Sequence, residues 1–122
     1  MLCGKMQGGG IVEIFCEEKT MLASFAVIPA GVEGGVKKLV AEVLKIVDES
    51  GLPYTLGAMS TTVEGEQDEV MAVIMKCHRK MLELCPRVLT NIAIDDRKGA
   101  TGRLRGKVED VEEVLGKRLG RG

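Results

Sequence analysis

The sequence predicts an α+β fold, the ferredoxin-like βαββαβ sandwich with an extra C-terminal helix. Two long stretches have the apolar spacing of amphipathic helices, and short runs of strand-forming residues flank each of them. The resulting order is strand, helix, strand, strand, helix, strand and a final helix. This is the split βαβ order, in which an antiparallel sheet carries its helices on one face.

The first strand and the first helix have the clearest patterns. Residues 22–28 form an apolar run that is broken only by Ser24, as in a central strand that is covered on both faces. Residues 36–47 place apolar side chains three or four positions apart, with charged side chains between them. Ser50-Gly51 ends the helix that this spacing predicts.

A hairpin, a second helix and a fourth strand follow. Strand-forming runs at 54–56 and 60–63 flank Gly57, which permits the bend between them. The helix expected over residues 67–84 precedes a strand at 87–94, and it has two apolar stripes where one is enough to cover a sheet. We expect the second stripe to form a subunit contact or to line a cavity. It comprises Met71, Met75, His78 and Leu82.

The termini differ from this central unit. Residues 1–20 are expected to be a flexible leader or an added strand, residues 21–119 the single domain, and residues 120–122 a tail. Residues 97–122 hold eight basic side chains against four acidic ones, which we interpret as a solvated basic tail rather than a nucleic-acid patch. The apolar stripe of the final helix comprises Leu104, Val108, Val111, Leu115 and Leu119.

Composition limits how the protein can be stabilised. The 122 residues include no Trp, two Phe and one Tyr, so the core must be aliphatic. A core of this kind is marginal in a lone small monomer, and the open face of the sheet lacks a cover. We therefore expect a homotetramer, arranged as a dimer of dimers.

Charge, hydropathy and cysteine usage argue against several classes of function. A net charge of −1 and few aromatic side chains favour neither nucleic acid nor a membrane surface as a partner. No apolar run approaches the roughly 20 residues of a membrane span, and no signal peptide is evident, which predicts a cytoplasmic protein. One histidine and four cysteines without a C-x-x-C pair predict no metal site.

The stretch Met59–Val70 concentrates chemistry in a few residues. Hydroxyls at the end of a strand, the carboxylate of Glu64 and the start of a helix converge there, as they do in many ligand sites. A purely structural interpretation is also open, because Thr-Thr-Val is ordinary strand sequence and acidic residues commonly begin helices.

Several motifs together resemble the YkoF-like thiamine-binding family over about residues 21–119. The string Thr-Thr-Val-Glu-Gly-Glu, together with Asp68, is the specific part of this resemblance. The motifs are Val27-Ile28-Pro29-Ala30-Gly31, Glu49-Ser50-Gly51-Leu52, Ser60–Glu66, Asp68-Glu69-Val70-Met71, His78, Arg87-Val88, and Ile94-Asp95-Asp96-Arg97 with Lys107. Related sequences usually carry Trp at the position of Gln67 and Ser in the region of Gly34-Gly35.

The resemblance implies a ferredoxin-like subunit, assembly into dimers and tetramers, and non-enzymatic binding of thiamine or its hydroxymethylpyrimidine moiety, with no other cofactor. The protein would then be a carrier or a sensor. Hydroxyls would serve the pyrimidine, a thioether would contact a ring, and Glu64 would meet the thiazolium charge. The candidate ligand-binding residues are Ser24, Met59, Thr61, Thr62 and Glu64.

Two rival functions stay open at this stage. One is a structural or regulatory oligomer that binds another small molecule. The other is an enzyme in which His78 and Glu64 act as acid and base.

Overall fold

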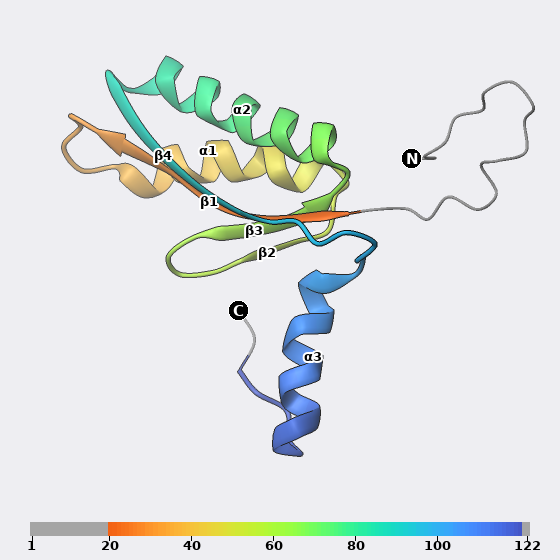
Figure 1. Ribbon diagram of the computed structural model, residues 1–122. Coiled ribbons are helices and arrows are strands. Elements are labelled where there is room, and N and C mark those ends of the chain that lie inside the picture. Colours follow the sequence, from red (N-terminus) through yellow and green to blue (C-terminus); the bar gives the residue numbers. More distant parts are fainter. Residues whose placement is uncertain (1–19, 121–122) are drawn as a thin grey trace, which may run out of the picture.

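The computed structural model describes residues 20–120, in which a four-stranded antiparallel sheet is flanked by helices on both sides (Figure 1). This arrangement confirms the predicted ferredoxin-like α+β fold with an added C-terminal helix. The elements are β1 (Met21–Ala30), α1 (Val36–Glu49), β2 (Tyr54–Leu56), β3 (Thr61–Gly65), α2 (Gln67–Leu84), β4 (Arg87–Asp95) and α3 (Arg103–Leu115).

The strands lie in the order β2-β3-β1-β4, so β1 is central. It pairs with β3 through Ser24 and Thr62, and with β4 through Ser24 and Ala93. Because side chains alternate between the faces of a strand, Ala23 and Phe25 face the helices while Ser24 faces away. In Figure 1, α1 and α2 cover one face of the sheet and α3 projects from the other.

The core lies between the sheet and the first two helices. The core includes four buried residues of α2 spaced three or four apart, Val70, Ile74, Cys77 and Met81, and two buried residues of α1, Val43 and Val47. The close packing of this core requires a glycine at position 65. A Cβ atom on Gly65 would lie 3.1 Å from a methyl group of Leu52 and 3.2 Å from one of Val70.

Only part of the second apolar stripe of α2 is exposed to solvent. Met71 packs against the core, while Met75 and Leu82 are 36% and 50% exposed. His78 Nδ1 lies 2.7 Å from Thr90 Oγ1 on β4, so the histidine is held by a strand hydroxyl. Two residues of this stripe thus lack a partner within the described part of the subunit.

The final helix is shorter than its apolar pattern predicts. It ends at Leu115 because Gly116 adopts a positive φ of 75°, and Leu119 lies beyond the helix. The prediction that Leu119 continues the helical stripe is therefore wrong. The predicted leader, except Thr20, lies outside the described residues, as do residues 121–122.

Burial of Cys77 gives a test of the core. Burial raises the pKa of its thiol from 9.0 to about 11, and the thiol donates to the carbonyl oxygen of Val43 at 3.6 Å. The unfolded chain loses this proton first, so the contribution of the thiol to stability is present below pH 9 and is lost as the pH rises to about 11. At pH 8 we expect a thiol reagent to modify Cys77 and Cys85 only after denaturation. Peptide mass spectrometry of labelled protein checks this, and rapid labelling of native Cys77 would contradict it.

Candidate ligand-binding cleft

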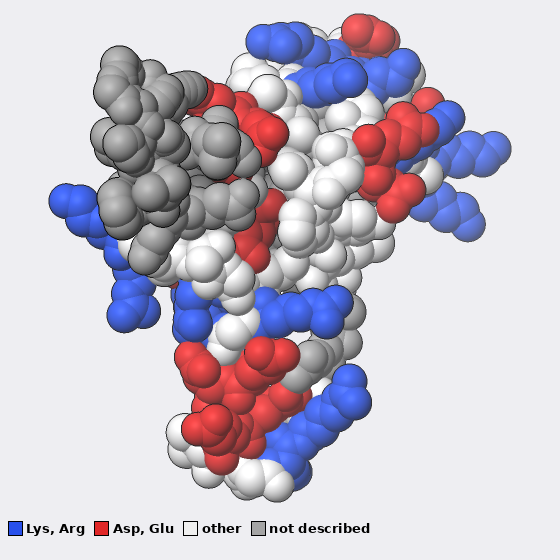
Figure 2. Space-filling view, turned by 90° about the vertical axis from the view of Figure 1, so that its right-hand side faces the viewer, with Lys and Arg blue, Asp and Glu red and all other residues white. Residues whose placement is uncertain are grey.

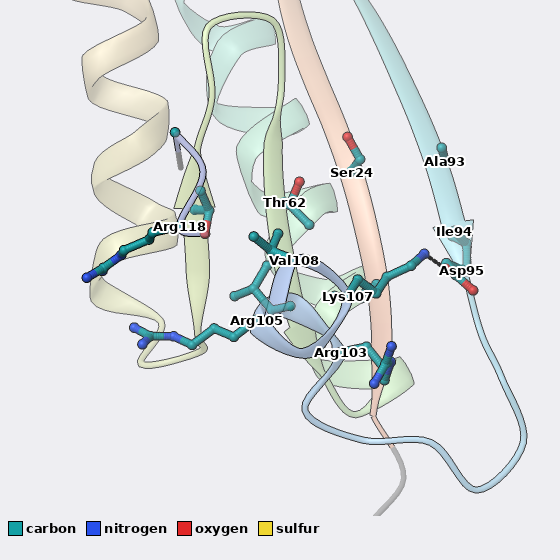
Figure 3. Close-up of a pocket in the computed structure, with 14 residues that line it drawn as sticks. Ser24, Thr62, Ala93, Ile94, Asp95, Arg103, Arg105, Lys107, Val108 and Arg118 are labelled. Carbon is teal, nitrogen blue, oxygen red and sulfur yellow. Dashed lines mark hydrogen bonds and ion pairs between the residues drawn. The ribbon is translucent and has the colours of Figure 1, made fainter. Parts of the chain in front are cut away.

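A cleft of about 680 Å³ lies between the open face of the sheet and α3 (Figure 3). We call it the sheet–α3 cleft. The sheet contributes Leu22, Ser24, Thr55, Thr62, Ala93, Ile94 and Asp95 to its lining. Helix α3 and the segment after it contribute Arg103, Leu104, Arg105, Lys107, Val108, Arg118 and Gly120 to the lining of the cleft.

The floor of the cleft carries a row of hydroxyl groups. Thr55 pairs with Thr62 across β2 and β3, and Thr62 pairs with Ser24 across β3 and β1, so three hydroxyl residues stand side by side on three strands. The Ser24 hydroxyl also shares a hydrogen bond of 2.8 Å with that of Ser60. Each hydroxyl can donate or accept, so the floor can match a heterocycle with both kinds of group along one edge.

Glu64 fixes the position of α3 above this floor. Glu64 is 6% exposed, and its carboxylate accepts hydrogen bonds from the backbone N–H of Arg103 at 2.8 Å and of Leu104 at 3.3 Å, and from the Thr20 hydroxyl at 2.7 Å. The first N–H groups of a helix have no partner within the helix, and Gly102 at the N-cap supplies no side chain. Glu64 meets this need from another element of the fold.

The charged residues of the lining are mostly basic. Lys107 forms an ion pair with Asp95, and the Arg103 guanidinium lies 2.8 Å from the Asp110 carboxylate. Lys107 holds the pKa of the Asp95 carboxyl below its usual value, with smaller contributions from Arg97 and Arg103. These contacts leave Arg105 and Arg118 as the lining cations without an ion pair to any described residue.

The predicted site residues divide between two faces of the sheet. Ser24 and Thr62 lie together on the cleft floor. Thr61, which is 5% exposed, and Met59, which is 88% exposed, instead border a separate apolar hollow of about 250 Å³ beside α1. Glu64, on β3, lies against the N-terminus of α3. Backbone N–H groups of α3 already bind its carboxylate there. Ligand contact by any of the five stays a prediction.

The rival acid–base pair is not assembled. His78 faces β4 from the helix side of the sheet, whereas Glu64 faces α3 on the opposite side. The sheet separates the two groups, so they cannot act on one substrate in this arrangement.

Sequence reasoning missed the wall of the cleft that α3 supplies. Arg103, Arg105, Lys107 and Arg118, which the sequence assigned to a solvated basic tail, border the cleft, and all but Arg103 are exposed to solvent there. One signal could have revealed them. Three basic residues in the first five positions of a helix oppose the helix dipole, so helix stability does not explain them.

Two further features of residues 20–120 bear on the class of protein. Within them, no group of three or more His, Cys, Asp or Glu side chains is arranged to hold a metal ion. Within the same range, no helix has the length and apolar character needed to cross a membrane.

The fold and the cleft define a small ferredoxin-like protein with a ligand-sized cavity on its sheet. The chain belongs to the thiamine-binding protein family, which matches residues 23–112. This agrees with the resemblance found in the sequence motifs.

Relatives and solved structures support the same assignment. The chain is 39% identical over 97 residues to UPF0045 protein Mb1933 of Mycobacterium bovis, covering 79% of this chain and 95% of the relative. It is 37% identical over 100 residues to UPF0045 protein YqgV of Bacillus subtilis, covering 77% and 96%.

Two crystal structures share the fold. The hypothetical protein MJ1052 of Methanocaldococcus jannaschii has a TM-score of 0.72 at 26% identity, covering 78% of this chain and 98% of the other. TM0486 of Thermotoga maritima, whose suggested role is thiamine biosynthesis or salvage, has a TM-score of 0.67 at 26% identity, covering 75% and 98%.

Glu64→Gln tests the anchoring of α3. Hydrogen bonds to a charged group contribute about 1.5–3 kcal/mol, so we expect a loss of stability in that range together with faster amide exchange at the start of α3. Thr20→Val, which removes one of the donors, should have a smaller effect in the same direction. Urea unfolding and hydrogen exchange measure both effects.

Glu42→Gln is the matched control, because Glu42 is exposed on α1. Its effect should stay within about 0.5 kcal/mol. If Glu64→Gln leaves stability and exchange unchanged but weakens thiamine binding, the carboxylate serves the ligand and not α3.

Proposed function

We propose that this chain binds thiamine or its hydroxymethylpyrimidine moiety in the sheet–α3 cleft, without catalysing a reaction. The observation that carries the proposal is the hydroxyl row of Thr55, Thr62 and Ser24 on the floor of a cleft of about 680 Å³ in a member of the thiamine-binding family. That volume lies within the range of about 300–1,000 Å³ typical of small-molecule sites.

The chemistry of the lining suits an aminopyrimidine. The ring presents nitrogen acceptors and an amino donor along one edge, and hydroxyls can serve both. Leu22, Leu104 and Val108 provide apolar surface for the faces of the ring. The suggested role of the Thermotoga maritima protein in thiamine biosynthesis or salvage is in keeping with this ligand class.

The separation of His78 from Glu64 favours binding over the rival acid–base chemistry. In this proposal the protein is a cytoplasmic carrier or sensor of the ligand, and no further cofactor takes part.

Substitutions on the floor test the site. Ser24→Ala and Thr62→Val each remove one hydroxyl, and a net hydrogen bond of about 0.5–1.5 kcal/mol predicts affinity losses of roughly two- to tenfold. Titration calorimetry with thiamine and with hydroxymethylpyrimidine measures them. Thr90→Val is the matched control, because Thr90 is a strand threonine that contacts His78 on the other face.

The outcomes separate the possible sites. Wild-type protein that binds neither compound would contradict the proposed function. If ligand affinity is unchanged in Ser24→Ala and Thr62→Val but lower in Thr61→Val, the ligand binds in the apolar hollow beside α1, where Thr61 and Met59 lie.

We further propose a homotetramer, arranged as a dimer of dimers. Two apolar areas support this assembly: Met75 and Leu82 on α2, and Ile28 and Leu89 on the open face of the sheet, which are 41% and 47% exposed. Two separate areas suit two kinds of contact, as a closed tetramer requires.

Light scattering should give four times the subunit mass of 13.1 kDa. Met75→Glu and Leu89→Glu place a charge in one or the other contact, so each should yield a smaller species, while Ala41→Glu on exposed α1 should not. A wild-type monomer at micromolar concentration would contradict this arrangement.

A further inference from the structure

We infer that the sheet–α3 cleft selects ligands that carry a phosphate group, with the pyrimidine on the hydroxyl row and the phosphate between Arg105 and Arg118. This inference rests on the proposed function and specifies the ligand class of the same site. It follows from the charges that the lining leaves unmatched.

The lining contains four basic side chains and one acidic one. Asp95 is matched by Lys107, and Arg103 is matched by Asp110. Arg105 and Arg118 form no ion pair with an acidic side chain among residues 20–120. An unphosphorylated thiamine would add a thiazolium cation to this surplus, whereas a phosphate monoester adds about −1.5 to −2 charges at neutral pH.

The position of the cations supports a role outside helix stability. The first half of α3 carries Arg103, Arg105 and Lys107, and the second half is acidic, which is the reverse of the order that the helix dipole favours. Figure 2 shows basic side chains at the level where the sheet meets α3 and acidic side chains farther along the helix. The basic half is the half that borders the cleft.

The chain also brings Arg118 back to the cleft. After Gly116 ends α3, the backbone N–H of Leu119 donates to the Glu112 carboxylate at 2.7 Å, which ties the following segment to the helix. In Figure 3 the side chains of Arg105 and Arg118 extend in the same direction, leftward in the view. Both residues are exposed, so they form a charged mouth above a neutral hydroxyl floor.

A guanidinium group is suited to this task. It presents several N–H donors in a planar fork that matches two phosphate oxygens at once, and it keeps its charge at all physiological pH values. Two such groups can hold a monoester without a metal ion. A neutral floor combined with a basic mouth fits a phosphorylated pyrimidine compound better than either part alone.

Two pairs of compounds test the inference by calorimetry: hydroxymethylpyrimidine with its phosphate, and thiamine with thiamine monophosphate. The phosphorylated member of each pair should bind at least about tenfold more tightly, as expected for new charge-assisted hydrogen bonds. This advantage should shrink as salt is raised from 20 to 300 mM, roughly as screening predicts. The salt series uses wild-type protein and needs no variant.

Variants identify the groups responsible. Arg105→Gln, Arg118→Gln and the double variant should lower stepwise the ratio of affinities between the phosphorylated and the unphosphorylated member of each pair. Lys37→Gln with Lys38→Gln is the matched control, since it removes two charges from exposed positions on α1. Melting curves establish that each variant is folded.

The binding measurements distinguish a failure of this inference from a failure of the proposed function. If the unphosphorylated compounds bind as well as their phosphates, the inference is overturned and the proposed function stands. If no pyrimidine compound binds, the proposed function is overturned and the inference with it. If inorganic phosphate competes as strongly as the pyrimidine phosphate, the floor does not recognise the ring, and the combined site is overturned.

Discussion

The cleft depends on one interaction, the seating of the Glu64 carboxylate against the first N–H groups of α3. The helix begins at a glycine cap that has no side chain, and no acidic residue stands in its first turn. Glu64 on β3 supplies both the acceptor and the negative charge that the N-terminus lacks, and Thr20 orients the same carboxylate. Because α3 forms one wall of the cleft, this contact holds that wall against the sheet. A buried carboxylate is stable here because it is fully engaged, and losing a donor would leave it unmatched.

The alternation of a strand explains why one motif serves two purposes. Along β3, Thr61 and Val63 turn toward the helices and are buried, whereas Thr62 and Glu64 turn toward α3. The continuous string from Ser60 to Glu66 therefore contributes a core residue, a floor hydroxyl and a helix anchor within four positions. A ligand that touches Thr62 cannot touch Thr61 from the same side. This divides the candidate residues more sharply than their proximity in sequence indicates.

The fold was predictable because its signals are local, and much of the site was not because its contacts are distant. Apolar spacing located α1 and α2, and strand-forming runs located the four strands, including the hairpin at Gly57. The hydroxyls of Ser24 and Thr62 were also found, since both lie in recognisable strands. The wall from α3 was missed because nothing local specifies that Glu64 meets Arg103, 39 residues away. Basic side chains after the last strand then resemble a solvated tail until that contact is known.

The distribution of the cleft along the chain suggests how its specificity is divided. The hydroxyl row and the basic half of α3 lie within the segment 23–112 that matches the family, whereas Arg118 lies beyond it. Gln67 and Gly34-Gly35, where the chain departs from related sequences, are not among the described lining residues. Both glycines have a φ of 67°, a left-handed conformation that favours glycine over serine for backbone reasons. The family segment thus supplies the floor and one wall, while the segment after α3 adds a charge at the mouth. Under the proposed function, the shared fold would recognise the ring, and residues that the fold does not dictate would contribute to recognition of the charged group.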